Sequence, residues 1–327
     1  GDRDANEHCR GGLMAARVLS RHVTVTDPEP RVDYTRVLVD SSAGPGPGLL
    51  GLIGLLLGYA VVVPGLLYAF LGVGWLLERT DGERFSAYYT RAAGYHTVGG
   101  LIATHVALAS LIVVVLVLAR YLNHRVPRWV ASVQPGIRWR FGLLVGLVAV
   151  VVLNLTQLLV RGGVNAHYIV PRHWWAWLLA IIITSPFQAI AEEMFFRGYL
   201  MNVISGLSVN LPEKAGCWTS VVVSALVFAF MHGTQNAWLF ADRFAFGLLA
   251  GWLVIVTGGL EAGVAAHVVN NLFAFGYAVF LGGVSQARGM TAMSWVDAAW
   301  DVGGFLTIAL AGWWIGSLMR VARRTPA

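Results

Sequence analysis

The chain has 327 residues, of which 57% are hydrophobic and only 12% are charged. Soluble domains carry about 25% charged residues, so these proportions exclude an ordinary soluble protein and predict an all-α polytopic membrane protein. The net charge of +6 does not indicate a nucleic-acid partner, because the Arg residues lie in tails and in loops between apolar runs. In such places they set membrane topology and meet anionic lipid headgroups.

The chain divides into a polar tail, a membrane domain and a short basic end. Residues 1–48 contain six Arg and finish in a Gly- and Pro-rich stretch, which predicts a disordered cytoplasmic tail. Residues 49–320 are interpreted as the transmembrane domain, and residues 321–327 as a basic C-terminal tail. The two cysteines, Cys9 and Cys217, lie in unrelated segments and offer neither a disulfide framework nor metal-ligand spacing.

Hydrophobic runs predict about eight transmembrane helices. They are expected at about 49–77, 97–118, 141–160, 174–204, 218–232, 244–257, 263–281 and 302–319. The fifth and sixth are shorter than the roughly 20 residues that cross a bilayer core. Eight spans put both termini on one side, and that side carries 15 Arg and Lys against seven on the other. The positive-inside rule therefore predicts cytoplasmic termini in a bacterial plasma membrane.

The fourth span carries three charged side chains, Glu192, Glu193 and Arg197. A charge at the bilayer centre costs roughly 2.5–3.5 kcal/mol on insertion scales, so this set is not expected by chance. Glu193 and Arg197 are four residues apart and can pair on one helix face. Glu192 is rotated about 100° from Glu193 by the helical period, so it is expected to point elsewhere and to lack a partner in its own helix.

Two later spans carry further polar groups that hydrocarbon disfavours. His232 follows Phe228 by one helical turn, and His267 and Asn271 are four residues apart on one face. Together with Glu192, these residues have the composition of a hydrolytic site. A carboxylate can deprotonate water, an imidazole can shuttle a proton, and an imidazole or amide N–H can hold an oxyanion.

Structural interpretations compete with these functional ones. A Glu193–Arg197 pair neutralises itself and is more often structural than catalytic. His105 is interpreted as a helix-to-helix hydrogen bond, and Asn154 and Gln157 as packing contacts. Function is favoured because both imidazoles occur in one chain with the acid at 192.

The order Glu-Glu-x-x-x-Arg, Phe-x-x-x-His and His-x-x-x-Asn, each on its own hydrophobic segment, resembles the CPBP family of intramembrane endopeptidases. This family includes CAAX prenyl-protein endopeptidases and bacteriocin-processing proteins, and the resemblance covers about residues 175–280. It implies a core of eight helices and proteolysis of a membrane-associated protein or peptide. It also implies that Glu192 and His232 activate water and that His267 with Asn271 holds the oxyanion.

The sequence leaves metal dependence open. Glu192, His232 and His267 would suffice to hold zinc or another divalent metal with one position left for water. The chain lacks the His-Glu-x-x-His arrangement in which one helix supplies two ligands and a base. Asn271 suits oxyanion binding better than ligation. A metal-free site, with water activated by glutamate, is therefore favoured.

Depth and side of the site are less determined. Counting along the fourth and fifth spans puts Glu192 near the cytoplasmic face and His232 far from it. The two residues meet only if the fourth helix is strongly tilted or begins in the membrane interface, or if the loop before the fifth span enters the membrane. The working expectation is a site that opens toward the cytoplasmic half.

Two other functions use the same residues. Intramembrane Glu, His and Arg could form a proton or ion relay in a transporter, or they could only hold helices together in a non-enzymatic scaffold. The composition, rich in Ala, Val, Gly, Trp and Arg with little Lys, is typical of GC-rich bacterial genomes. This favours peptide maturation, immunity or signalling over CAAX trimming.

Overall fold

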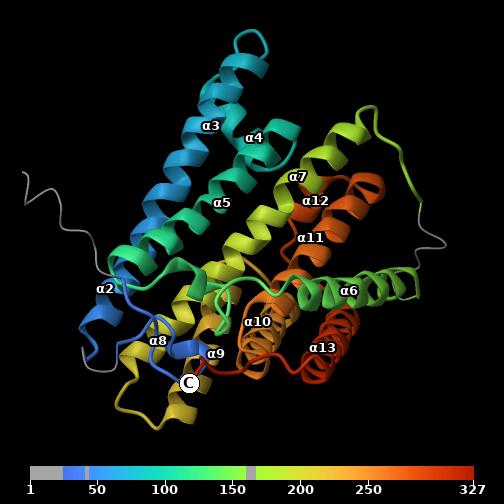
Figure 1. Ribbon diagram of the computed structural model, residues 1–327. Coiled ribbons are helices and arrows are strands. Elements are labelled where there is room, and N and C mark those ends of the chain that lie inside the picture. The colour runs from blue at the N-terminus through green and yellow to red at the C-terminus, as the bar shows by residue number, and fades with distance from the viewer. Residues whose placement is uncertain (1–24, 41–43, 160–166) are drawn as a thin grey trace, which may run out of the picture.

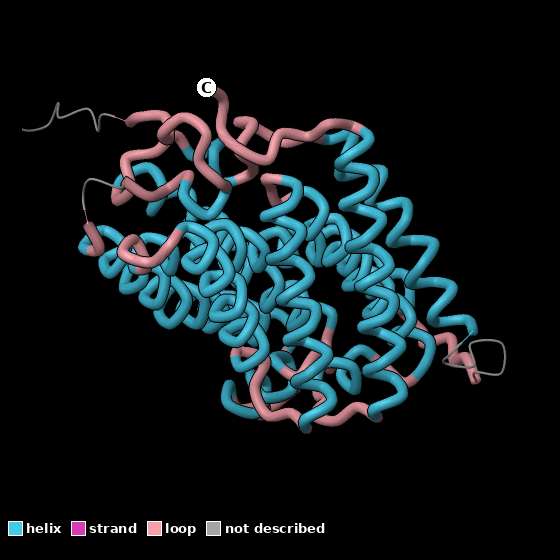
Figure 2. The backbone as a smooth tube through the Cα atoms, turned by 90° about the horizontal axis from the view of Figure 1, so that it is seen from below, coloured by secondary structure: helices cyan, strands magenta, loops and turns pink. Residues whose placement is uncertain are grey.

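The fold is a bundle of helices, as expected. The computed structural model describes residues 25–40, 44–159 and 167–327, and within them eight helical spans are long and apolar enough to cross a membrane. Figure 1 shows the spans in chain order, and Figure 2 shows loops gathered at the two ends of the bundle. The all-α membrane architecture is confirmed.

The spans follow one another along the chain, with connections of different lengths. They are α2–α3 (Gly46–Leu57 and Val63–Glu78, joined by the π-helical turn Gly58–Val62), α5 (Val98–Tyr121), α6 (Trp139–Leu159), α7–α8 (Trp174–Glu193 and Met201–Leu207, joined by the π-helical turn Met194–Leu200), α9 (Glu213–Phe230), α10 (Ala237–Thr257), α11 (Glu261–Leu281) and α13 (Trp295–Leu318). Two short helices lie between spans, α4 (Phe85–Ala93) and α12 (Val284–Arg288), and single 3₁₀ turns occur at Tyr34–Arg36 and Pro127–Val130.

The fourth span is much longer than a bilayer requires. It runs from Trp174 to Leu207 without a break, 34 residues in all, which is about 51 Å at 1.5 Å per residue. In Figure 1, α7 runs diagonally between α5 and α11, and it packs on both. Glu192 therefore lies near the middle of a tilted helix, and α9 returns from a turn far beyond it. This length removes the mismatch in depth between Glu192 and His232.

The fifth and sixth spans are longer than expected. The end of the fifth and the start of the sixth, which a turn connects, differ from the predicted positions. The helix α9 stops at Phe230, so His232 lies in the turn after it, where Gly233 has a φ of +84°. The helix α10 begins at Ala237 rather than near Phe244, with Asn236 accepting a hydrogen bond from the backbone of Leu239 as N-cap. The predicted start of this span near Phe244 is therefore too late, and the residues it omits include the charged Asp242 and Arg243.

Residues 25–40 differ from the expected disordered tail. Tyr34, Val37 and Leu38 are buried against the bundle, and the Tyr34 hydroxyl donates to the carbonyl of Val130. The amide of Leu38 donates to Asn202 Oδ1 at 3.0 Å. The expectation for the rest of the tail falls partly on residues 1–24 and 41–43, which lie outside the described residues.

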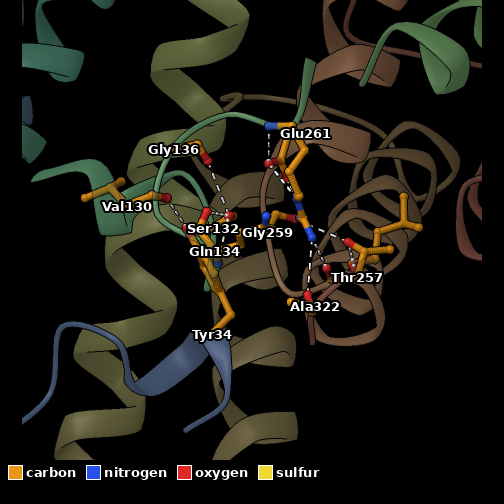
Figure 3. Close-up of polar contacts among 11 residues, drawn as sticks. Tyr34, Val130, Ser132, Gln134, Gly136, Thr257, Gly259, Glu261 and Ala322 are labelled. Carbon is orange, nitrogen blue, oxygen red and sulfur yellow. Dashed lines mark hydrogen bonds and ion pairs between the residues drawn. The ribbon is translucent and has the colours of Figure 1, made fainter. Parts of the chain in front are cut away.

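A buried ion pair closes the end of the bundle that carries the chain termini. Arg138, just before α6, bonds the Glu261 carboxylate at 2.8 and 2.5 Å and also donates to the carbonyls of Thr257 and Ala322. Figure 3 shows Glu261, Thr257 and Ala322 around this contact. The start of α6, the α10–α11 turn and the C-terminal tail are thereby joined.

The outer surface of the spans is apolar. Leu143, Leu147, Ile182 and Leu310 are each about half exposed or more. An apolar surface of this extent cannot face water in a stable monomer, which fits an integral membrane protein.

Candidate active site

The acidic pair lies at the end of α7. Glu193 and Arg197 are both completely buried, and Arg197 Nη1 donates to Glu193 Oε1 at 3.0 Å. The pairing therefore matches the four-residue spacing in the sequence. Because a buried charge without a partner is strongly unfavourable, each of these groups requires the other.

Aromatic rings enclose the Arg197 guanidinium. Its carbon lies 4.4 Å from the ring centre of Phe228 and 5.5 Å from that of Phe246, distances typical of cation–π contacts. These contacts give Phe228 a structural role in the Phe-x-x-x-His motif. Phe246, on α10, has no counterpart in the motifs, and its ring also lies 5.0 Å from that of His267.

His267 lies between the two carboxylates. Its Nδ1 is 2.9 Å from Glu193 Oε1, and its Nε2 is 3.5 Å from Glu192 Oε2. The expectation that Glu192 points away from Glu193 is therefore only partly met. The helix α11 crosses α7 over the surface between the two acids, so one imidazole reaches both although they differ by about 100° around the helix.

Gln188 connects Glu192 to Asn271 and was not among the predicted site residues. Gln188 Nε2 donates to Glu192 Oε1, and Gln188 Oε1 accepts from Asn271 Nδ2 at 2.9 Å. The sequence holds a signal for it, because positions 188 and 192 are one helical turn apart. Asn271 thus uses one amide N–H within the protein, which sequence analysis did not anticipate.

His232 joins the group from the α9–α10 turn. Its ring packs on Phe228 with centres 4.5 Å apart, and its Nδ1 contacts the Phe228 carbonyl at 2.7 Å. Glu192 and His267 are its electrostatic neighbours. The structure therefore brings the predicted residues of three spans together, with His232 contributed by a turn instead of a helix.

A cavity of about 780 Å³ adjoins these residues. His232, His267 and Asn271 form part of its wall, while Glu192 lies behind His267 with 13% of its side chain exposed. The cavity is large enough for several residues of a peptide. Other polar side chains that line it are Thr156, Gln157, Asp242, Arg243, Asn270, Gln286 and Asp301.

The cavity lies in the half of the bundle remote from the C-terminus. Its wall includes the end of α11, α12 and exposed Met290 and Thr291 in the following loop, and Figure 1 shows α12 at the opposite end from the C-terminus. The cytoplasmic position of the termini and the side on which the site opens both stay predictions.

Three polar residues were expected to connect or pack helices. His105 and Asn154 do so, whereas Gln157 does not. His105 Nδ1 contacts Thr184 Oγ1 across α5 and α7 at 2.9 Å. Asn154 bonds the Val150 carbonyl and accepts from the Tyr277 hydroxyl. Gln157, expected only to pack, instead lines the cavity.

The ligand set considered for a metal does not fit in this structure. Among the described residues, no group of three His, Cys, Asp or Glu side chains is arranged to hold a metal ion. His232 and His267 each use Nδ1 in a contact with the protein. Metal dependence therefore stays a matter for experiment, and the chemistry below is derived without a metal step.

Comparisons with known proteins agree with this geometry. Residues 173–273, which include every predicted site residue, match the family model described as type II CAAX prenyl endopeptidase Rce1-like. This confirms the resemblance and supports an intramembrane endopeptidase at the level of the family. An uncharacterized protein of Bacillus subtilis (strain 168), YyaK, is 26% identical over 182 residues. The match covers 53% of this chain and 59% of YyaK, so the chain spans about three fifths of that relative. No solved structure matches.

Proposed function

We propose that this chain, whose residues 173–273 match the Rce1-like endopeptidases, hydrolyses a peptide bond of a membrane-associated protein or peptide. One observation carries the proposal. An unbroken set of contacts joins Gln188, Glu192, His267, Glu193 and Arg197 beside a cavity of about 780 Å³. The imidazoles of His232 and His267 therefore line a peptide-sized space, and both acids contact the His267 ring.

Each group has a chemical role in this proposal. Glu192, assisted by His232, takes a proton from water, and the hydroxide oxygen adds to the carbonyl carbon of the substrate. An N–H of Asn271 and the His267 ring stabilise the negative oxygen that forms. The C–N bond then breaks, and the proton returns to the leaving amine. Glu193 and Arg197 hold His267 without reacting.

The proposal is tested in membranes of a bacterial host. Peptide termini are compared by mass spectrometry between cells that make the wild-type chain and cells that make Glu192→Gln at equal levels. We expect new termini in membrane-associated proteins only with the wild type. Identical profiles, in a host that encodes the native substrates, would contradict proteolysis. The identity of any protein with new termini would indicate whether the chain serves peptide maturation or signalling.

A proton relay built on the same residues makes a different prediction. Glu192→Gln would abolish proton uptake into vesicles that contain the purified protein and would leave peptide termini unchanged. The cavity favours hydrolysis, because its described lining lies in one half of the bundle, whereas a transport path needs access from both.

Chelation tests the metal-free mechanism. Purified protein in detergent is incubated with EDTA and 1,10-phenanthroline and then given a library of internally quenched peptides. Because Glu192 is proposed to activate water itself, we expect cleavage to continue at a similar rate. Loss of cleavage that zinc alone restores would reverse this choice.

A further inference from the structure

Three side-chain amides connect the cavity wall to the carboxylate of Glu192. Asn270 Nδ2 donates to Asn271 Oδ1 at 3.3 Å, Asn271 Nδ2 donates to Gln188 Oε1 at 2.9 Å, and Gln188 Nε2 donates to Glu192 Oε1. All three bonds run in the same direction and end on the carboxylate. Hydrogen bonds in such a chain polarise one another and gain strength in a medium of low dielectric constant.

The members of the chain have different positions relative to the cavity. Asn270 and Asn271 line it, whereas Gln188 is buried behind them and does not. Glu192 is also outside the described lining, but its carboxylate lies 3.5 Å from a ring nitrogen of His267, which does line the cavity. The Gln188 amide acts on the reaction through its two bonded partners, Glu192, which accepts a hydrogen bond from it, and Asn271, which donates one to it.

Glu192 has no cation bonded to it of the kind that fixes Glu193. The Glu193 carboxylate is held by Arg197 and His267, whereas the described contacts of the Glu192 carboxylate are Gln188 on one oxygen and the His267 ring, at 3.5 Å, on the other. A carboxylate with two contacts turns about its terminal bond if one is lost. The orientation of the proposed base thus depends on Gln188.

We propose that Gln188 is the positioning residue of the site, and that the amide chain Asn270–Asn271–Gln188 sets the orientation of the Glu192 carboxylate from the cavity wall. This inference rests on the proposed endopeptidase function. It also gives Asn271 a role besides oxyanion binding, because its amide is the link between the wall and Gln188.

The test uses purified full-length protein in detergent and the best-cleaved member of the quenched-peptide library. Gln188→Met keeps the length of the side chain and removes both hydrogen bonds. We expect kcat to fall about 10- to 100-fold, as for other errors in positioning, while KM stays within about twofold because Gln188 does not touch the cavity. Gln134→Met, in an exposed loop at the terminal end, is the matched control and should behave as wild type.

A double-mutant cycle separates positioning from packing. If Asn270 and Gln188 act through one chain, Gln188→Met with Asn270→Leu should be no slower than the slower single variant, and Asn270 has no separate role in oxyanion binding that could multiply the effects. Multiplied effects would overturn the proposal, as would an unchanged kcat or a loss confined to KM. If Gln188→Met does not fold, Gln188→Asn replaces it, because an amide shorter by one methylene cannot reach both partners, and the same outcomes apply.

Failure of the inference is distinguishable from failure of the function. If Glu192→Gln retains the cleavage rate of the wild type, the endopeptidase mechanism itself is wrong. If Glu192→Gln is inactive while Gln188→Met cleaves normally, only the role of the amide chain is wrong.

Discussion

At the scale of single residues, spacing in the sequence predicted contacts within a helix but not contacts between helices. The Glu193–Arg197 bond follows from four-residue spacing and is present at 3.0 Å. The partners of His267 and Asn271 depend on how α11 is rotated against α7, which the sequence does not encode locally. For that reason the bridge from His267 to both acids and the role of Gln188 emerged only from the structure.

The Glu193–Arg197 pair gives the first stability prediction. Arg197→Ala leaves a fully buried carboxylate without its cation, and breaking a buried pair in this way costs about 3–5 kcal/mol. We expect a large drop in thermal unfolding temperature in detergent. Arg323→Ala, which changes an exposed Arg of the C-terminal tail, should leave that temperature nearly unchanged.

An Arg197→Ala protein that unfolds at the wild-type temperature would show that the pair contributes nothing to the fold. The contacts of Arg197 with Phe228 and Phe246 would then have to stabilise the buried guanidinium without Glu193.

At the scale of elements, hydrophobic runs located all eight helices but misplaced the ends that matter for the site. The fourth span was expected to end near residue 204, whereas it continues to Leu207 and has 34 residues. The predicted start of α10 omitted Asp242 and Arg243, although both lie within the helix and line the cavity. The charged residues of this span therefore indicated the wall of the cavity and not the end of the helix.

The segment 25–40 yields a pH prediction. Burial, followed by a hydrogen bond with Glu213, raises the pKa of Asp33 from 3.8 to about 6, against the opposing effect of Arg324. A carboxyl group with a raised pKa favours the folded state while protonated, and this contribution is lost as pH rises through about 6. The segment should therefore attach more firmly at pH 4.5 than at pH 7.5.

Hydrogen exchange at the amide of Leu38, corrected for the intrinsic rate, measures this attachment, because that amide donates to Asn202. Asp33→Asn, which is neutral at both pH values, should remove the difference between them. Stronger protection at pH 7.5 than at pH 4.5 in the wild type would contradict the assignment.

At the scale of the whole molecule, the chain topology determines which end of the bundle gives access to the site. The number of spans and the bias of Arg and Lys could be obtained from the sequence, but the depth of the cavity could not, because it depends on helix lengths and tilt. The described lining belongs to the end remote from the C-terminus. We therefore expect the mouth of the cavity and the C-terminus to lie on opposite membrane faces.

Cysteine labelling in cells tests this arrangement. With Cys9 and Cys217 replaced, Thr291→Cys at the cavity mouth and Arg323→Cys in the C-terminal tail are treated with a membrane-impermeant maleimide before and after permeabilisation. We expect one to react in intact cells and the other only after permeabilisation. Reaction of both from the same side would contradict the eight-span topology, and the side that labels Thr291→Cys identifies the face from which substrates enter.

The central claim is that Glu192 activates the water that cleaves a peptide bond. Its most direct test is the cleavage rate of purified wild-type and Glu192→Gln protein on the quenched-peptide library, with equal thermal stability as the condition for comparison. Loss of a catalytic base predicts a rate lower by about 10²- to 10⁴-fold for Glu192→Gln. Equal rates for the two proteins would contradict the account.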